Sequence, residues 1–199
     1  MIKLFSYIEQ YLKLSESEKK SIAENCCFIE LKKGDYFLQL NEHCNKIGFV
    51  NKGILRAFHY DQDGNDITKS FIQTQQFATN LKSFRDNTLS DSLIVAEIDT
   101  EVIVMTKENI ANLSLQIPNW SEAVSYIIES KLLEKMKHRT RMVNQDATVR
   151  YLDFLTTHKN LVNQVPLRHI ASYLGITQSS LSRIRKSVLK NNFLPNDKI

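Results

Sequence analysis

Apolar residues recur with two different periods along this chain. Near the N-terminus, Leu4, Ile8 and Leu12 are four residues apart, which predicts a helix over Leu4–Leu14 with one apolar stripe. The segment that begins with Ser15 has the Ser-x-x-Glu spacing of a capping box, which predicts the start of a second short helix. Two helices should therefore precede the first strand.

Between Cys27 and Met105 the pattern changes to short runs rich in β-branched and aromatic residues, separated by turn-forming segments such as Lys52-Gly53. These runs predict strands at Phe28–Leu31, Tyr36–Leu40, Ile47–Val50, Ile54–Tyr60, Asp66–Ile72, Leu93–Glu97 and Glu101–Met105. Many short strands with turns between them are typical of an antiparallel sandwich or roll. We therefore expect the middle of the chain to be a β domain.

A long helix is predicted after this β region, following a shorter one at about Lys107–Leu115. Its apolar residues recur four apart between Trp120 and Val143, at Trp120, Val124, Ile128, Leu132 and Met136. A helix of about 25 residues is about 37 Å long, which is more than a small domain needs for its own packing. We expect the stripe to pair with a second copy of the chain. The alternative is that it packs on the β domain.

The C-terminal segment has the pattern of two short helices joined by a tight turn. The first is predicted at Leu167–Leu174 and ends at Gly175, where a positive φ costs least. Thr177 then caps a second helix. The buried face of this helix carries Leu181, Ile184 and Val188. This order is a helix-turn-helix arrangement, which presents the first turns of its second helix to the DNA major groove.

The opposite face of the second helix carries polar and basic residues. Arg can bridge two acceptors of guanine, Gln can pair with adenine, and Ser can donate or accept. We expect base contacts from Gln178, Ser179, Ser182 and Arg183. Phosphate contacts are expected from Arg168, Thr177, Ser180, Arg185, Lys186 and Lys190. A basic helix can also be no more than a solvated surface, but the turn glycine, the cap and the apolar triplet favour DNA binding.

Charge is divided unevenly along the chain. Residues 1–130 contain 13 Lys or Arg and 18 Asp or Glu, whereas residues 131–199 contain 13 and 4. No acidic residue lies between Asp153 and Asp197. This split indicates a polyanionic partner for the C-terminal part. A domain boundary is expected near Asn144-Gln145, without a long Gly/Ser linker.

The composition is that of a globular protein: 199 residues, 42% apolar and 24% charged, with 5 Gly and 3 Pro. No apolar run approaches the roughly 20 residues of a membrane-spanning helix, and no leader pattern is recognisable, so a cytoplasmic location and no membrane partner are expected. Cys26 and Cys27 are adjacent and Cys44 is the third cysteine. An odd number in this arrangement favours a reducing compartment and a role as small buried hydrophobes.

Motifs of catalysis are missing from the sequence, which contains no G-x-S-x-G, H-E-x-x-H, P-loop or G-x-G-x-x-G pattern. The nearest cluster is Glu42-His43-Cys44, which approaches His59 only if the strands pair. Isolated His and Cys residues in a β domain are more often structural. We therefore expect no enzyme activity, no metal and no cofactor.

The segments Ile170–Thr177 and Leu181–Lys186 resemble the helix-turn-helix of the Crp-Fnr transcription regulators, the cyclic-AMP receptor protein family. Upstream, Lys33-Gly34-Asp35 and Val50–Arg56, followed by Gly64, are similar to the turns of that family's β-roll. The long helix also lies where the family has its dimer helix. The resemblance covers nearly the whole chain and implies a homodimer that binds a pseudo-palindrome.

The implied fold is α+β. It consists of an N-terminal cyclic-nucleotide-binding-like β-roll (a double-stranded jelly roll), a long dimerisation helix, and a C-terminal winged-helix-like helix-turn-helix domain. The corresponding domains are residues 1–117, 118–144 and 145–199. Residues 193–197 leave room for only a reduced wing.

The effector pocket departs from the family's pattern. Members that bind cyclic nucleotide have a glycine-glutamate pair for the ribose and an arginine-serine pair for the phosphate. Counted from Phe77, these pairs fall on Thr79-Asn80 and Ser90-Asp91, so both charged ligands are missing. Asp91 would place an anion beside the phosphate, and Arg85 is the nearest substitute cation. The four cysteines of the family's oxygen-sensing branch are also missing.

We therefore expect a homodimeric, sequence-specific transcription regulator that binds double-stranded DNA, with residues 178–190 in the major groove and an effector domain that does not bind cyclic AMP. RNA polymerase is a further partner if the protein is an activator. The alternative is a ligand-sensing module that binds an unidentified small molecule or cyclic nucleotide and acts through contacts with other proteins.

Overall fold

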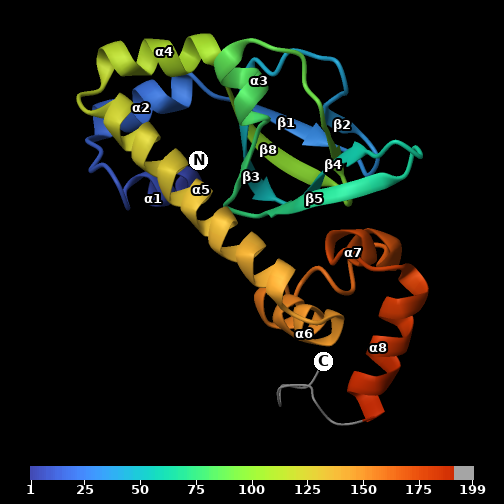
Figure 1. Ribbon diagram of the computed structural model, residues 1–199. Helices are drawn as coiled ribbons and strands as arrows, with labels where there is room; N and C mark the ends of the chain where they lie inside the picture. Colours follow the sequence, from blue (N-terminus) through green and yellow to red (C-terminus); the bar gives the residue numbers. More distant parts are fainter. Residues whose placement is uncertain (191–199) are drawn as a thin grey trace.

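Two antiparallel four-stranded sheets face each other in the N-terminal part of the chain (Figure 1). The computed structural model describes residues 1–190, apart from the side chains of residues 138 and 141–143. One sheet has the order β1 (Cys27–Leu31), β8 (Thr100–Thr106), β3 (Lys46–Lys52), β6 (Phe77–Ala78). The other has the order β2 (Tyr36–Leu38), β7 (Leu93–Ala96), β4 (Ile54–Tyr60), β5 (Asp66–Gln73). The predicted β-roll is therefore confirmed.

The core of the roll lies between the two sheets. Phe37, Val50, Leu55, Ile94 and Val102 are buried there in one cluster. They come from five different strands, whose alternate side chains point inward. Apolar burial of this kind is the main force that holds two sheets together.

The turn between β3 and β4 depends on Gly53. Its φ is +111°, and a Cβ at this position would lie 2.7 Å from the Cα of Thr100. Both the backbone conformation and the close approach of β8 therefore require glycine. This turn belongs to the segment whose resemblance to a β-roll was noted from the sequence.

Two helices precede the roll: α1 (Ile2–Ile8) and α2 (Glu16–Glu24). The capping box of α2 is present as predicted, because Ser15 accepts from the Glu18 N–H and the Glu18 carboxylate accepts from the Ser15 N–H. The predicted length of the first helix is wrong. After Ile8 the chain turns, and the ring of Tyr11 packs against Tyr7 and Tyr126, so local helix periodicity yields to aromatic packing.

Two short elements have no clear signal in the sequence. One is the two-residue strand β6, which exists only through its pairing with Gly48 and Phe49 of β3. The other is α3 (Leu81–Asp86), whose first turn is capped by the Asn80 side chain. Both lie in the segment that the family resemblance assigns to the effector pocket.

A long helix, α5 (Trp120–Asn144), follows α4 (Lys107–Gln116) and runs from the roll to the C-terminal helices (Figure 1). These helices are α6 (Ala147–Thr157), α7 (Leu167–Tyr173) and α8 (Gln178–Lys190). Asp146 caps α6 by accepting from the Thr148 and Val149 N–H groups. None of the described helices combines the length and apolar character that a membrane crossing requires. The predicted wing at residues 193–197 lies outside the described residues.

Candidate nucleic-acid interface

The helix-turn-helix unit is built as the sequence predicts. Gly175 follows α7 with φ +67°, and the Ile176 N–H donates to the Ala171 carbonyl, which closes the turn. Thr177 Oγ1 then accepts from the Ser180 N–H at 3.1 Å and so caps α8. The buried residues that join the two helices include Ile170, Leu174, Leu181 and Val188.

The outward face of α8 carries the residues expected to contact bases. Gln178, Ser179 and Arg183 are exposed, and Ser182 is partly buried. Arg183 lies four residues, about one turn, beyond Ser179, so both side chains project from the same face. The arrangement can present donors and acceptors to a groove. The individual base contacts stay predictions.

The residues expected to contact phosphates fall into two groups. Lys186, Lys190 and Arg168 are exposed, as is Thr177, while Ser180 and Arg185 are partly buried. Arg185 lies near the Tyr151 hydroxyl: burial raises the pKa of Tyr151, and the Arg185 charge partly offsets this. Arg185 is therefore less free to reach a phosphate than Lys186.

The apolar stripe of α5 is divided between two uses. Trp120 is only 3% exposed and packs in the N-terminal cluster that also contains Leu4, Phe49 and Leu113. Val124 is partly buried against the same cluster. Further along, Ile128 is half-buried, whereas Leu132 and Met136 are 46% and 66% exposed. The exposed part of the stripe is thus the half nearer the C-terminal helices α6, α7 and α8.

The residues at the expected effector pocket bind one another. Asn80 Nδ2 lies 2.9 Å from Ser90 Oγ and 3.0 Å from both Asp91 Oδ1 and Ser92 Oγ. Thr79 Oγ1 lies 3.4 Å from the Lys46 carbonyl, to which it donates. The four residues Asn80, Ser90, Asp91 and Ser92 are called the Asn80 cluster below.

The charges around this cluster do not suit an anion. Partial burial raises the pKa of Asp91, but the Asn80 hydrogen bond and the nearby Lys69 outweigh it and hold the pKa below its usual value. Asp91 is therefore an anion at neutral pH. Arg85 pairs with Asp86 and its side chain is 75% exposed, so it does not join the cluster.

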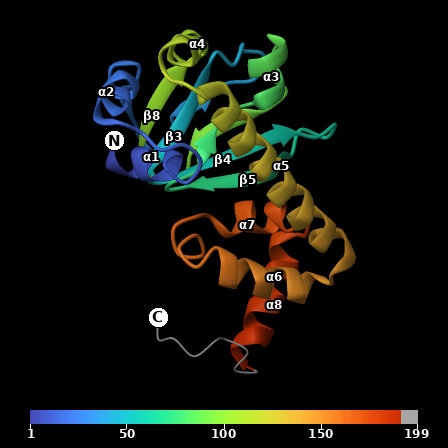
Figure 2. The same cartoon turned by 90° about the vertical axis from the view of Figure 1, so that its left-hand side faces the viewer.

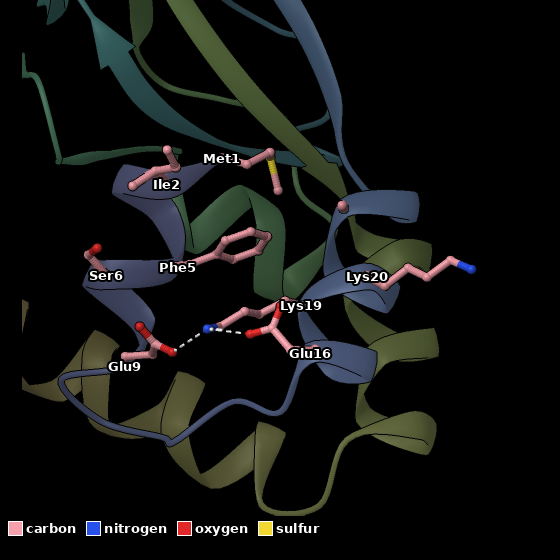
Figure 3. Close-up of a pocket in the computed structure, with 9 residues that line it drawn as sticks. Met1, Ile2, Phe5, Ser6, Glu9, Glu16, Lys19 and Lys20 are labelled. Carbon is pink, nitrogen blue, oxygen red and sulfur yellow. Dashed lines mark hydrogen bonds and ion pairs between the residues drawn. The ribbon is translucent and has the colours of Figure 1, made fainter.

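An open hollow lies between α1 and α2 at the N-terminal end (Figure 3). Phe5 and Ala23 line it, and Lys19 forms ion pairs with Glu9 and Glu16 at 3.0 and 3.1 Å (Figure 3). Its charges are thus largely paired among themselves. None of the residues singled out in the sequence lies in this hollow.

The three cysteines are unpaired thiols in different environments. Cys27 is exposed, Cys44 is buried, and burial raises the pKa of Cys26 to about 12, with a smaller contribution from Cys27. The expectation of buried hydrophobes is therefore wrong for Cys27, because β1 lies at a sheet edge. Within residues 1–190, His, Cys, Asp and Glu form no group of three or more that could hold a metal ion.

The sequence pattern does not identify one polar network. Arg56 on β4, Glu97 after β7, and His169 on α7 are buried together although they are far apart in the chain. The one available signal is Arg56, a charged residue in an otherwise apolar strand.

Comparison with known proteins finds matches in sequence and in fold. The family model described as the cyclic nucleotide-binding domain matches residues 28–116. A sequence comparison with curated proteins gave no match. The structure of FixK2 from Bradyrhizobium japonicum is 15% identical and has a TM-score of 0.74, covering 87% of this chain and 89% of that one.

Two other solved structures extend the likeness over more of the chain. The c-di-GMP responsive global regulator CLP from Xanthomonas campestris is 12% identical, with a TM-score of 0.72 over 92% of this chain and 96% of that one. A protein described as a transcriptional regulator of the Crp/Fnr family, from Eubacterium rectale, is 18% identical, with a TM-score of 0.70 over 95% and 92%. The resemblance in fold is therefore confirmed from the roll to the helix-turn-helix.

Proposed function

We propose that the protein is a homodimeric, sequence-specific DNA-binding regulator of transcription. The premise is that residues 28–116 belong to the cyclic nucleotide-binding domain family and that the chain has the fold of the Crp/Fnr regulators. The observation that carries the proposal is the outward face of α8. It combines exposed Gln178, Ser179, Arg183 and Lys186 with the capped N-terminus of the second helix of a helix-turn-helix.

DNA recognition is assigned to α8. Its first turns enter the major groove, where Arg183 pairs with the two acceptors of a guanine and Gln178 and Ser179 contact neighbouring bases. Thr177 and the helix N-terminus bind a phosphate, and Lys186 and Lys190 neutralise others. The uninterrupted absence of acidic residues from 154 to 196 supports this assignment.

Dimerisation is assigned to α5, with residues 118–144 as the pairing segment between a sensor-like domain (1–117) and a DNA-binding domain (145–199). Leu132 and Met136 are exposed at 46% and 66% in the single chain, and a second copy of the helix would bury them. Two α8 helices related by a twofold axis then fit half-sites about one helical turn apart in a dyad-symmetric operator. RNA polymerase is a further partner if the protein activates transcription.

The roll is proposed not to bind cyclic AMP or cyclic GMP. A buried phosphate needs a cation or several N–H donors. The Asn80 cluster instead offers the Asp91 carboxylate and two serine hydroxyls that are already bonded to Asn80. Another ligand, or none, then acts on the roll.

Selection of bound duplexes from a random pool tests the proposal. We expect enrichment of a dyad-symmetric motif with two half-sites about one helical turn apart. A protein that neither enriches a motif nor retards duplex DNA at moderate salt contradicts the proposal. That outcome would favour the alternative of a ligand sensor that acts through protein contacts.

A further inference from the structure

The helix-turn-helix unit is docked on one edge of the roll. Strand β5 is the last strand of its sheet, and α7 lies beside it in both views (Figures 1 and 2). Ser172 on α7 donates to the Asp66 carbonyl at 3.0 Å and accepts from the Thr68 N–H at 2.9 Å. A side chain of α7 thus satisfies backbone groups that an edge strand leaves unpaired.

Apolar packing continues this contact along β5. Phe71 lies in one buried cluster with Phe154 and Tyr173, at ring centroid distances of 6.4 and 5.4 Å. Ile54 of the roll belongs to the same cluster. The core of the DNA-binding domain therefore includes two buried residues of the roll, Ile54 and Phe71, with the partly buried Ile98 packed against them, and the two domains do not have fully separate cores.

Three buried polar side chains lie at the end of this interface. Arg56, Glu97 and His169 are only 4%, 4% and 6% exposed. Arg56 Nε lies 2.7 Å from Glu97 Oε1, and Arg56 Nη2 lies 2.9 Å from Asp66 Oδ2. His169 Nδ1 lies 2.8 Å from the same Glu97 oxygen. Glu97 thus joins an arginine of the roll to a histidine of the DNA-binding domain.

The two ring nitrogens of His169 face different partners. Arg168 Nε–H donates to His169 Nε2 at 3.1 Å. Nδ1 lies on the other side of the ring, 2.8 Å from Glu97 Oε1. The ring connects a carboxylate of the roll, on one side, with Arg168, an exposed residue of the DNA-binding face, on the other.

We propose that His169 is a positioning residue, which fixes the orientation of the helix-turn-helix unit on the roll through its contact with Glu97 and so sets the angle at which a dimer presents its two α8 helices. This inference rests on the proposed function. Buried ion pairs contribute little net stability, because desolvation offsets their attraction, and in some proteins they instead specify geometry. Three of the residues proposed to contact bases, Gln178, Ser179 and Arg183, are exposed.

The spacing between half-sites gives a readout that a loss of stability alone would not move. Inserting two base pairs between the selected half-sites rotates one of them by about 70°. We expect the wild-type dimer to bind this altered duplex at least about tenfold more weakly. A helix-turn-helix unit whose orientation on the roll is not fixed follows the rotated half-site. Its affinity for the altered duplex should therefore fall by less than about threefold.

Two substitutions of His169 separate its contacts. In His169→Asn, the side-chain amide keeps a polar group near the position of Nδ1, beside Glu97, and loses the acceptor for Arg168. In His169→Gln, the polar group is near the position of Nε2 and the contact with Glu97 is lost. We expect His169→Gln to lose the spacing preference and His169→Asn to keep it. Asp99→Asn is the matched control, because Asp99 pairs with Lys32 on the surface, close to Glu97 in sequence.

Amide hydrogen exchange tests the docking without DNA. The Thr68 N–H donates to Ser172 of α7, whereas the Val50 N–H donates to Gln76 inside the roll. In His169→Gln, Thr68 should exchange at least about tenfold faster while Val50 is unchanged.

The two proposals fail in different ways. If the wild-type protein binds no duplex, the proposed function fails, and the exchange of Thr68 still tests the docking. Equal Thr68 exchange in the wild type and in His169→Gln, or an unchanged spacing preference in His169→Gln, overturns the role of His169.

Discussion

The two polar surfaces that the sequence singles out differ in how their hydrogen bonds are used. On α8, Gln178, Ser179 and Arg183 are exposed, and the Ser179 hydroxyl bonds locally, to Thr177 Oγ1 at 3.0 Å. In the Asn80 cluster of the roll, the Asn80 side chain bonds to the side chains of Ser90, Asp91 and Ser92. An open polar surface is available to a partner, whereas a closed cluster must break its own bonds before it binds one. The comparison supports the proposal that the C-terminal part of the chain carries recognition.

Separating the two chains of the proposed dimer is the strongest way to test the open surface. Placing Glu at both Ile128 and Leu132 puts charges in the pairing seam, so we expect a monomer in light scattering. Binding to the dyad-symmetric operator should weaken by at least about 100-fold, because the second half-site no longer adds to the first. Apolar replacements at the same positions, Ile128→Leu with Leu132→Met, should keep the dimer. A wild type that is monomeric at micromolar concentration contradicts the assignment of α5.

Removing a single base contact tests which face of α8 enters the groove. Arg183→Ala should cost about 1–3 kcal/mol at one base pair of each half-site and relax the selected motif there. Lys186→Ala is the matched control. It should weaken all sequences alike and reduce the salt dependence by about one counterion, because a phosphate contact carries no base information. An Arg183→Ala protein that selects an unchanged motif shows that α8 is wrongly placed.

The contrast between the C-terminal helices and the roll also separates elements that the local sequence predicts from elements that it misses. The bounds of α7 and α8 agree with the sequence to within about a residue, because Gly175 and Thr177 act on their own neighbours. Strand β6 is missed because its pairing with the distant strand β3 defines it. Helix α3 is missed, although Asn80 caps it, because six residues are too few to show a helical period.

The docking of the two domains lies beyond local prediction for a related reason. Arg56, Glu97 and His169 are separated by more than 40 residues at each step, and no periodicity connects them. Apolar stripes likewise give no partner: Trp120 and Met136 share one stripe, yet the first is used inside the chain and the second is exposed.

Replacing Asn80 tests whether its hydrogen bonds hold the Asn80 cluster together. Asn80→Ala removes the cap of α3 and leaves Ser90 and Ser92, both buried, without their amide donor. We expect the free energy of unfolding to fall by about 1–3 kcal/mol in urea titrations. The control is Arg85→Ala on the same helix, which removes an exposed pair with Asp86 and should change stability little. Equal stability of Asn80→Ala and the wild type would mean that the cluster is not a closed structural unit.

The smallest expected effect is the response to cyclic nucleotides, because the Asn80 cluster provides no favourable contact for their phosphate. A cyclic phosphate at this place would meet the Asp91 carboxylate, whose pKa is held low by Asn80 and Lys69, and would have to displace the Asn80 hydrogen bonds. The nearest arginine, Arg85, is paired with Asp86 at the surface. We therefore expect no heat of binding in calorimetry with cyclic AMP or cyclic GMP at up to about 100 μM, which corresponds to a binding free energy weaker than about −5.5 kcal/mol. Asp91→Asn removes the repulsion and keeps the side-chain shape, so any weak binding should appear first in that variant. Micromolar affinity in the wild type would show that the Asn80 cluster opens readily, and the contrast with α8 would then be wrong.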